Sequence, residues 1–363
     1  MGKISDIIRH NRLYAVLLVF IILINLLIFA DWMAERSEKR AGTVVQGEWT
    51  EKETARPPEK KLFNEEDIKT RQKRLKDLAA ERPLFYLFFG VLNLLILFAV
   101  FTGLILDIYF LTRWLRKKPL EMQLVEQSSP RWGIADIARV TLIFLSFGYI
   151  FVILQSLAVK FFPILYNENF HMIFNTAAMN IVGISVILYF VIGKYGQTAS
   201  ALGLVSKRIS SGVFYAAVGY VTLIPVFLAI MVITFFVTRL IEYQPPVQPI
   251  VRVFMEEKET GVLWFSALFA AIFGPIAEEI FFRGFMYTAV RKKMGIFWAM
   301  VITSAIFAFL HTHIVGFLPI MALGMLLAFL YQKTGSLVAP ISVHIMHNIA
   351  MVILVFLARS VGT

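Results

Sequence analysis

Long apolar runs are the feature that most constrains what this chain can fold into. Most of them reach ~18 residues or more with few charges, the length that a helix needs to cross a bilayer. The runs are continuous, whereas the strands of a membrane barrel alternate with a period of two. The sequence therefore predicts an all-α fold, a polytopic transmembrane helical bundle of about eight or nine spans. We expect spans at 13–30, 84–111, 137–159, 171–192, 213–238, 262–282, 296–312, 318–332 and 337–357.

The basic residues predict how the bundle is oriented. The chain of 363 residues is 58% hydrophobic and 16% charged, with a formal net charge of +11. Its Lys and Arg residues gather in alternate loops on the side of the N-terminus, and the positive-inside rule makes that side cytoplasmic. No basic patch interleaves with exposed aromatic residues, so we expect no nucleic-acid partner. We expect a multi-pass protein of the plasma membrane, in contact with membrane lipids, whose first span is an uncleaved anchor.

Two charged segments predict a division of the chain. Residues 31–83 are dense in charges of both signs, and from Asn64 onward they have the N-cap and acidic first turn of a helix. This loop is either a solvated spacer or a contact for a partner outside the cytoplasm. Residues 112–136 form a basic linker. We therefore expect an N-terminal two-span appendage at 1–130 and the working core at 131–363. Cysteine is absent, which excludes disulfides and thiol catalysis.

Three ionisable residues stand inside an apolar run, in the stretch PIAEEIFFRGFM. Polar groups are costly within a bilayer, so their default interpretation is functional. Glu279 and Arg283 are four residues apart and can pair on one helix face. Glu278 lies about 100° around the helix, which leaves its carboxylate uncommitted and suited to act as a general base. Gly274 and Pro275 predict a break or kink just before the pair. The alternative is that both glutamates only brace helix packing.

Two further polar pairs occur at helical spacing. Phe307 and His311 are four residues apart in FAFLH, and His344 and Asn348 are four apart in HIMHN. The two histidines could bind a metal or orient a water molecule. The amide of Asn348 could donate a hydrogen bond to a developing oxyanion. We interpret the remaining histidines of this region as packing residues: His313 and His347.

Together these motifs resemble those of a known family. EEIFFR fits EExxxR, FAFLH fits FxxxH and HIMHN fits HxxxN, in this order. Each motif is weak alone, but the three in order within apolar spans resemble the CPBP intramembrane protease family, also called the Abi family. That family includes the type II CAAX prenyl endopeptidases and bacteriocin-processing proteins. The motifs span 278–348 and the resemblance extends over 200–357, so it does not explain the first 130 residues.

The resemblance implies an intramembrane endopeptidase that cleaves membrane-associated or lipidated peptide substrates with a glutamate-activated water. Glu278 would activate the water, while Glu279 and Arg283 would orient the site. A divalent metal such as Zn²⁺, held by Glu278, His311 and His344, and a metal-free mechanism in which the same groups hold water are both compatible with the sequence. The candidate catalytic residues are Glu278, Glu279, Arg283, His311, His344 and Asn348.

Two matters stay open at the level of the sequence. The first is a non-proteolytic function, either a bacteriocin immunity or regulatory protein or a proton-coupled carrier, since intramembrane Glu and His also serve proton relays. The second is depth. At ~1.5 Å per residue, Glu278 lies near mid-membrane, His311 at the far end of its span and His344 about a third of the way in. One site therefore requires tilted or bent helices. The sequence predicts no particular oligomeric state.

Overall fold

The computed structural model describes residues 12–45, 83–118, 120, 122, 129–161, 168–205, 208–243, 248–311 and 314–362. These residues form helices and contain no strand, so the predicted all-α class is confirmed. The chain divides into two compact units, one made of Ile22–Phe101 and the other of Met1–Ile21 with Thr102–Thr363. The domain boundary expected at residue 130 stays a prediction.

The first two helices are α2 (Arg12–Val45) and α4 (Pro83–Leu115). α2 runs well past residue 30, where the first span was expected to end. The reason is local, because the continuation DWMAERSEKRA is rich in good helix formers although it is polar. The residues predicted as a charged loop therefore begin as helix. The helix expected from Asn64 onward lies outside the described residues.

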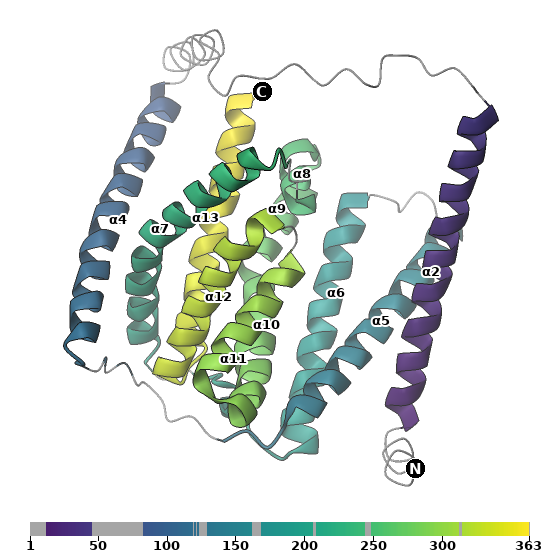
Figure 1. Ribbon diagram of the computed structural model, residues 1–363, viewed down its shortest axis with the longest axis horizontal. Helices are drawn as coiled ribbons and strands as arrows, with labels where there is room; N and C mark the ends of the chain where they lie inside the picture. The colour runs from purple at the N-terminus through teal and green to yellow at the C-terminus, as the bar shows by residue number, and fades with distance from the viewer. Residues whose placement is uncertain are drawn as a thin grey trace. The chain divides into compact units, whose positions relative to one another are not determined.

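The larger unit contains the remaining helices, shown in Figure 1. In chain order they are α5 (Ile134–Phe161), α6 (Glu168–Leu188), the π-helix η3 (Tyr189–Lys194), the 3₁₀-helix η4 (Ala199–Leu202), α7 (Ile209–Leu240), α8 (Pro249–Glu256), α9 (Thr260–Leu268), the π-helix η5 (Phe269–Phe273), α10 (Gly274–Glu279), the π-helix η6 (Ile280–Tyr287), α11 (Thr288–His311), α12 (Ile314–Thr334) and α13 (Val338–Gly362).

Eight helical runs in the described chain are long and apolar enough to cross a membrane. One of them, Thr260–His311, has 52 residues. At ~1.5 Å per residue it is more than twice as long as the ~30 Å hydrocarbon core. It bends at Gly295, where φ is 81° and ψ is 173°, a left-handed conformation that glycine adopts without strain. The expected spans 262–282 and 296–312 fall on either side of this bend, so the prediction of eight or nine spans is confirmed.

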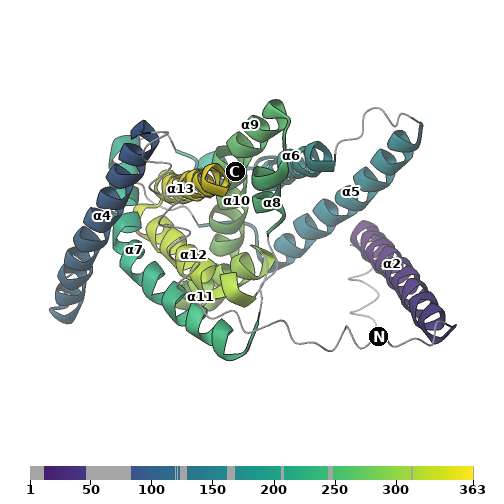
Figure 2. The same ribbon diagram turned by 90° about the horizontal axis from the view of Figure 1, so that it is seen from above.

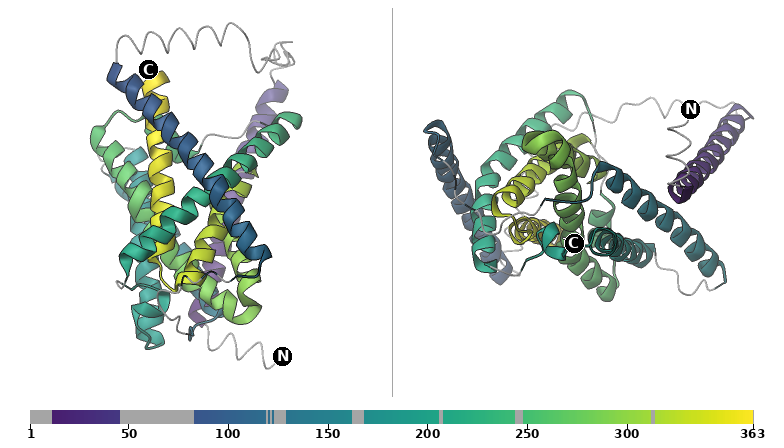
Figure 3. Two further views of the ribbon diagram at one scale, coloured as in Figure 1. Left: turned by 90° about the vertical axis from the view of Figure 1, so that its left-hand side faces the viewer. Right: turned by 90° about the horizontal axis from the view of Figure 1, so that it is seen from below.

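The last helices form the packed centre of the larger unit. α12 packs against α11, α13 and α7, and α10 packs against α6 and α13. Figures 2 and 3 show α13 beside α12, with α10 and α11 close by. Expected as a short span at 318–332, α12 is in fact a full 21-residue helix. In an apolar 18-residue stretch of α12, 39% of the residues are buried inside the protein. In the corresponding stretch of α5, only 6% are buried. Little of α5 is buried, as expected of a lipid-facing helix, whereas α12 is the central helix of the core.

A buried anchor joins the segment before α5 to this centre. Trp132 is fully buried, stacks on Phe285 and donates its indole N–H to the carbonyl of Phe285 at 2.9 Å. Asp136 lies one turn further on and is also buried. It accepts hydrogen bonds from Arg139, Lys194, Tyr195 and the backbone of Gly133. The linker that was expected to be a simple basic connection therefore ends in a fixed contact with η3 and η6.

Candidate active site

The two adjacent glutamates stand where one long helix changes its winding. η5 is a π-helix, α10 begins at Gly274 with Pro275 in its first turn, and η6 is again a π-helix. π-turns inside α-helices are rare and are frequent at functional sites. The kink predicted from Gly274 and Pro275 is realised as this change from π to α winding. It sets the direction in which the two carboxylates leave the helix.

Glu279 is the buried hub of the site. Its Oε1 accepts a hydrogen bond from Nη1 of Arg283 at 2.6 Å, and His344 Nδ1 lies 2.9 Å from the same oxygen. All three side chains are almost completely buried. Arg283 also donates from Nη2 to the carbonyl of Gly324 at 3.2 Å. The predicted pair therefore exists, and it ties α10 and η6 to both α12 and α13.

Glu278 faces the two histidines. Its Oε2 lies 3.4 Å from Nε2 of His311 and 3.7 Å from Nε2 of His344. These distances exceed the ~2.7–2.9 Å of a charge-assisted hydrogen bond. Within the described protein, the buried Oε2 atom of Glu278 has no hydrogen-bond partner. Glu278 and His311 are about one-third exposed, at 30% and 33%, whereas the side chain of His344 is 3% exposed. The site is therefore open only on the side of Glu278 and His311.

The contacts of the two Nδ1 atoms determine the tautomer of each histidine. They therefore determine which ring nitrogen presents a lone pair to Glu278. Nδ1 of His311 lies 2.8 Å from the carbonyl of Phe307, which can only accept, so this nitrogen carries the hydrogen. Nδ1 of His344 lies against the carboxylate of Glu279 and donates in the same way. In the neutral rings both Nε2 atoms are then acceptors. Three acceptor atoms converge on one small space, which requires a proton, a water molecule or a cation between them.

Phe307 fills the space behind this cluster. Its ring centroid is 4.3 Å from that of His311 and 5.6 Å from that of His344. The guanidinium of Arg283 lies 4.5 Å from the same centroid, a cation–π contact. The sequence showed only the spacing between Phe307 and His311. The structure adds that Phe307 is a buried wall that contacts both histidines and the arginine.

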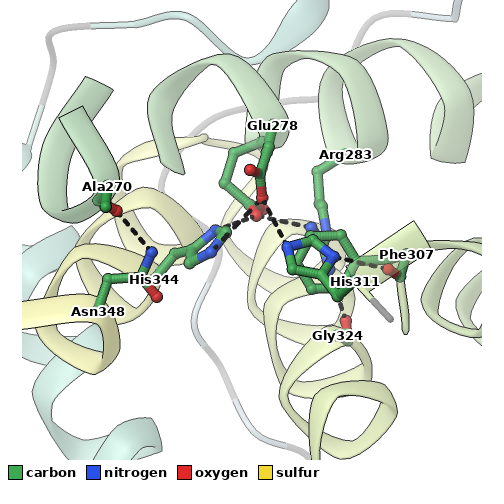
Figure 4. A network of polar contacts seen from close by, with 9 residues as sticks. Ala270, Glu278, Arg283, Phe307, His311, Gly324, His344 and Asn348 are labelled. Carbon is green, nitrogen blue, oxygen red and sulfur yellow. Dashed lines mark hydrogen bonds and ion pairs between the residues drawn. The ribbon is translucent and has the colours of Figure 1, made fainter. Parts of the chain in front are cut away.

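Asn348 is directed to a neighbouring backbone group. Its Nδ2 donates a hydrogen bond to the carbonyl of Ala270, in η5, at 2.8 Å. Figure 4 shows this bond beside His344 rather than between the two histidines. The role of Asn348 as an oxyanion donor therefore stays a prediction, and one of its two amide hydrogens is already in use. Ala270 and Gly324 enter the site through their carbonyls, which no side-chain pattern in the sequence reveals.

Of the two histidines interpreted as packing residues, His347 packs against aromatic side chains. His347 lies between α13 and α7, with its ring near those of Tyr220 and Phe227 and its Nδ1 3.4 Å from the hydroxyl of Tyr220. This is the packing role expected of it. His313 lies outside the described residues.

The residues around Glu278 can be tested for their fit to a metal. Two ligands each ~2.0–2.1 Å from a tetrahedral Zn²⁺ ion stand about 3.4 Å apart, and the two glutamate–histidine separations of 3.4 Å and 3.7 Å are close to this. Imidazole and carboxylate groups both occur as ligands of Zn²⁺. In the part of the chain that the structure describes, no three such side chains form a ready metal cluster. The donors thus fit a divalent ion in type and pairwise distance, without a preformed three-ligand cage.

The comparisons with known proteins match the part of the chain that holds these residues. Residues 260–350 match the family described as type II CAAX prenyl endopeptidase Rce1-like. This segment is thus similar to an Rce1-like domain. It contains all six candidate residues and the resemblance predicted from the three motifs is confirmed.

One curated relative is similar to part of the chain. The chain is 39% identical to "Putative membrane peptidase YdiL" of Bacillus subtilis (strain 168) over 85 residues, which are 23% of this chain and 35% of that protein. The chain thus spans about a third of the length of the curated relative it matches. No solved structure matches the chain.

Proposed function

We propose that this protein is an intramembrane endopeptidase that hydrolyses peptide bonds with a water molecule activated by Glu278. The observation that carries the proposal is the convergence of three acceptor atoms, Oε2 of Glu278 and Nε2 of His311 and His344. A water molecule placed between them can donate both of its hydrogens to acceptors, which directs an oxygen lone pair outward. The Rce1-like match of residues 260–350 and the similarity to a membrane peptidase support the same reaction class.

The reaction then follows from the positions of the side chains. Glu278 takes a proton from the water as its oxygen attacks the peptide carbonyl carbon. The C–N bond breaks when the proton held by Glu278, or one held by a histidine, passes to the leaving nitrogen. Glu279 keeps the ring of His344 in the orientation that exposes Nε2, and Arg283 fixes Glu279. These two residues act by positioning, because both are buried away from the open side of the site.

A divalent ion such as Zn²⁺, when bound, would polarise the attacked carbonyl or lower the pKa of the water, and Glu278, His311 and His344 are the residues that would hold it. The roles of Glu279 and Arg283 are the same in either case. Chelation therefore separates the two forms of the mechanism without changing the assignment of the residues.

The substrate class follows from where the site lies. Glu278 is in the middle of a helical run that is apolar enough to cross a membrane. A substrate must therefore reach it from the bilayer or its surface, which favours membrane-associated or lipidated peptides. With the N-terminus in the cytoplasm, we place the protein in the plasma membrane, with substrates that approach from the cytoplasmic side.

The test is proteolysis by the purified full chain in liposomes. Wild type, Glu278→Gln and the control Glu256→Gln, which changes an exposed glutamate at the end of α8, are compared on quenched peptides with and without a lipid anchor. We expect cleavage by wild type and by the control, and none by Glu278→Gln. Loss of cleavage on chelation, restored by Zn²⁺, would select the metal form. Equal cleavage by all three proteins would refute the assignment of Glu278. No cleavage by any would favour the binding or immunity function.

A further inference from the structure

The π-turn before Glu278 leaves one backbone carbonyl without a helical partner. The N–H of Gly274 donates to the carbonyl of Phe269, five residues back, instead of the usual four. In the same winding, the carbonyl of Ala270 would accept from residue 275. Residue 275 is proline, which has no N–H. The carbonyl of Ala270 is therefore deprived of both donors that the helix could offer.

The side chain of Asn348 supplies the missing donor. Its Nδ2 reaches the carbonyl of Ala270 at 2.8 Å from α13, a helix that follows it by more than sixty positions in the chain. A carbonyl without a hydrogen-bond partner is costly in an apolar surrounding, because no water is present there to replace the missing donor. This hydrogen bond thus compensates for a defect that Pro275 creates, and it attaches η5 to the helix that carries His344.

The shape of this turn directly affects the position of Glu278. Gly274 lies between Ala270 and Glu278, and a Cβ atom built on it would stand 3.3 Å from the carbonyl of Phe269 and 3.9 Å from Oε1 of Glu278. The carboxylate of Glu278 therefore lies over the bare backbone of the turn. A change in the winding at 269–273 would move the carboxylate relative to the two histidines.

We propose that Asn348 is a positioning residue, whose amide holds the carbonyl of Ala270 in place of the N–H that Pro275 lacks and so keeps Glu278 directed at His311 and His344. This inference rests on the proposed function, since it concerns the placement of its base. It differs from the oxyanion role predicted from the sequence, in which Asn348 would contact the substrate. In the positioning role, Asn348 acts through Ala270 and Pro275 and is dispensable when the turn has its own donor.

The experiment restores that donor. Asn348→Ala, Pro275→Ala and the double variant are compared with wild type for kcat, KM and melting temperature in the same liposomes or detergent. Alanine at 275 has an N–H that can bond to the carbonyl of Ala270. We expect Asn348→Ala to lower kcat by about 100-fold, the effect of a misplaced catalytic group, with little change in KM. In the Pro275→Ala background, the same change should lower kcat far less, and the melting temperature should recover in parallel.

The outcomes separate this inference from the proposed function. Equal losses of kcat from Asn348→Ala in both backgrounds, with the melting temperature recovered, would overturn it and assign Asn348 to the oxyanion. Equal losses of both quantities would overturn it as well, because Pro275 would then not be the reason for the bond. If wild type cleaves nothing, the proposed function fails first, and the coupling of the two substitutions in melting temperature alone decides whether the bond to Ala270 compensates for Pro275.

Discussion

Two buried charged clusters in this protein differ in how completely their polar atoms are satisfied. Around Asp136, Oδ1 accepts from Arg139 and Lys194 at 2.8 Å each, and Oδ2 accepts from the hydroxyl of Tyr195 and the backbone of Gly133. Around Glu278 and Glu279, by contrast, one carboxylate oxygen of each residue is buried without a hydrogen-bond partner in the described structure. Both clusters join helices that are distant in the chain.

This difference indicates how a catalytic carboxylate can be distinguished from a structural one. A carboxylate whose acceptor positions are all filled holds helices together and has nothing left to offer a substrate. The unpartnered carboxylate oxygen of Glu278 in the described structure, next to the Nε2 lone pairs of two histidines, lowers the stability of the folded protein. Such a loss of stability is typical of sites where a reaction takes place. Substitution of Glu278 should therefore lower turnover but not stability, and substitution of Asp136 should lower stability but not turnover.

The largest effect is expected for Glu278→Gln. Removal of the base should lower kcat by about 10²- to 10⁴-fold. The free energy of unfolding should stay the same or rise, because the amide N–H of glutamine can donate to the bare Nε2 of a neighbouring histidine. Turnover on a quenched peptide and unfolding in detergent give the two quantities. A variant that is both inactive and clearly destabilised would place Glu278 among the structural carboxylates.

Breaking the buried ion pair should have the next largest effect. Arg283→Met leaves the charge of Glu279 buried and without its arginine, which is expected to cost about 3–5 kcal/mol. The matched control is Arg139→Met, since Asp136 keeps Lys194 and Arg139 is partly exposed. That control should cost no more than about 1 kcal/mol. Unfolding free energies in the same detergent compare the two variants, and equal losses would remove the distinction between the clusters.

Asp136→Asn probes the satisfied cluster by itself. The neutral amide loses two charge-assisted hydrogen bonds and should lower the free energy of unfolding by about 1–3 kcal/mol. The kcat of the folded fraction should equal that of wild type, since the cluster touches no candidate catalytic residue. A fall in kcat at full folding would show that the anchor around Trp132 and Asp136 reaches the site through η6.

The smallest effect concerns a carboxylate outside both clusters, Glu257, which lies between the spans. Hydrogen bonds from the backbone N–H of Glu259 and from Asn169 lower the pKa of Glu257 below its ordinary value of 4.5. A lowered pKa in the folded state adds stability above pH 4.5, and this contribution is lost as the pH falls through the folded pKa. Melting temperatures of wild type and Glu257→Gln should therefore differ at neutral pH and converge in acid. A difference that does not change with pH would contradict this.

Much of the fold could be predicted from the sequence because membrane spans are read from length and hydropathy. The bend at Gly295 lies between two expected spans. The pair of Glu279 and Arg283 was also predictable, since a spacing of four residues places them on one face. The polar continuation of α2 was missed because helix propensity, rather than hydropathy, extends that helix.

The rest of the site depends on contacts between helices, which spacing alone does not contain. Both glutamates lie near His344, but it is Glu279 that touches Nδ1 and Glu278 that faces Nε2. The winding of η5 and η6 decides this division. The concern that Glu278, His311 and His344 lie at different depths is answered by the distances, since Oε2 of Glu278 lies 3.4 Å and 3.7 Å from the two Nε2 atoms. The partner of Asn348 could not be foreseen either, because nothing in the sequence marks Ala270 as lacking a donor until the π-turn is known.

The π-turn at Phe269–Phe273 also has a consequence for how a wide turn can be gained or lost in a membrane helix. A π-turn holds one residue more than an α-turn. Deletion of a single codon within this stretch would restore a regular helix and leave the direction of Glu278 and Glu279 nearly unchanged, because the wide turn absorbs the extra residue. Hydropathy, length and the number of spans would hardly change. A wide turn just before two carboxylates can therefore appear or vanish through one inserted amino acid, while the rest of the membrane helix keeps its register.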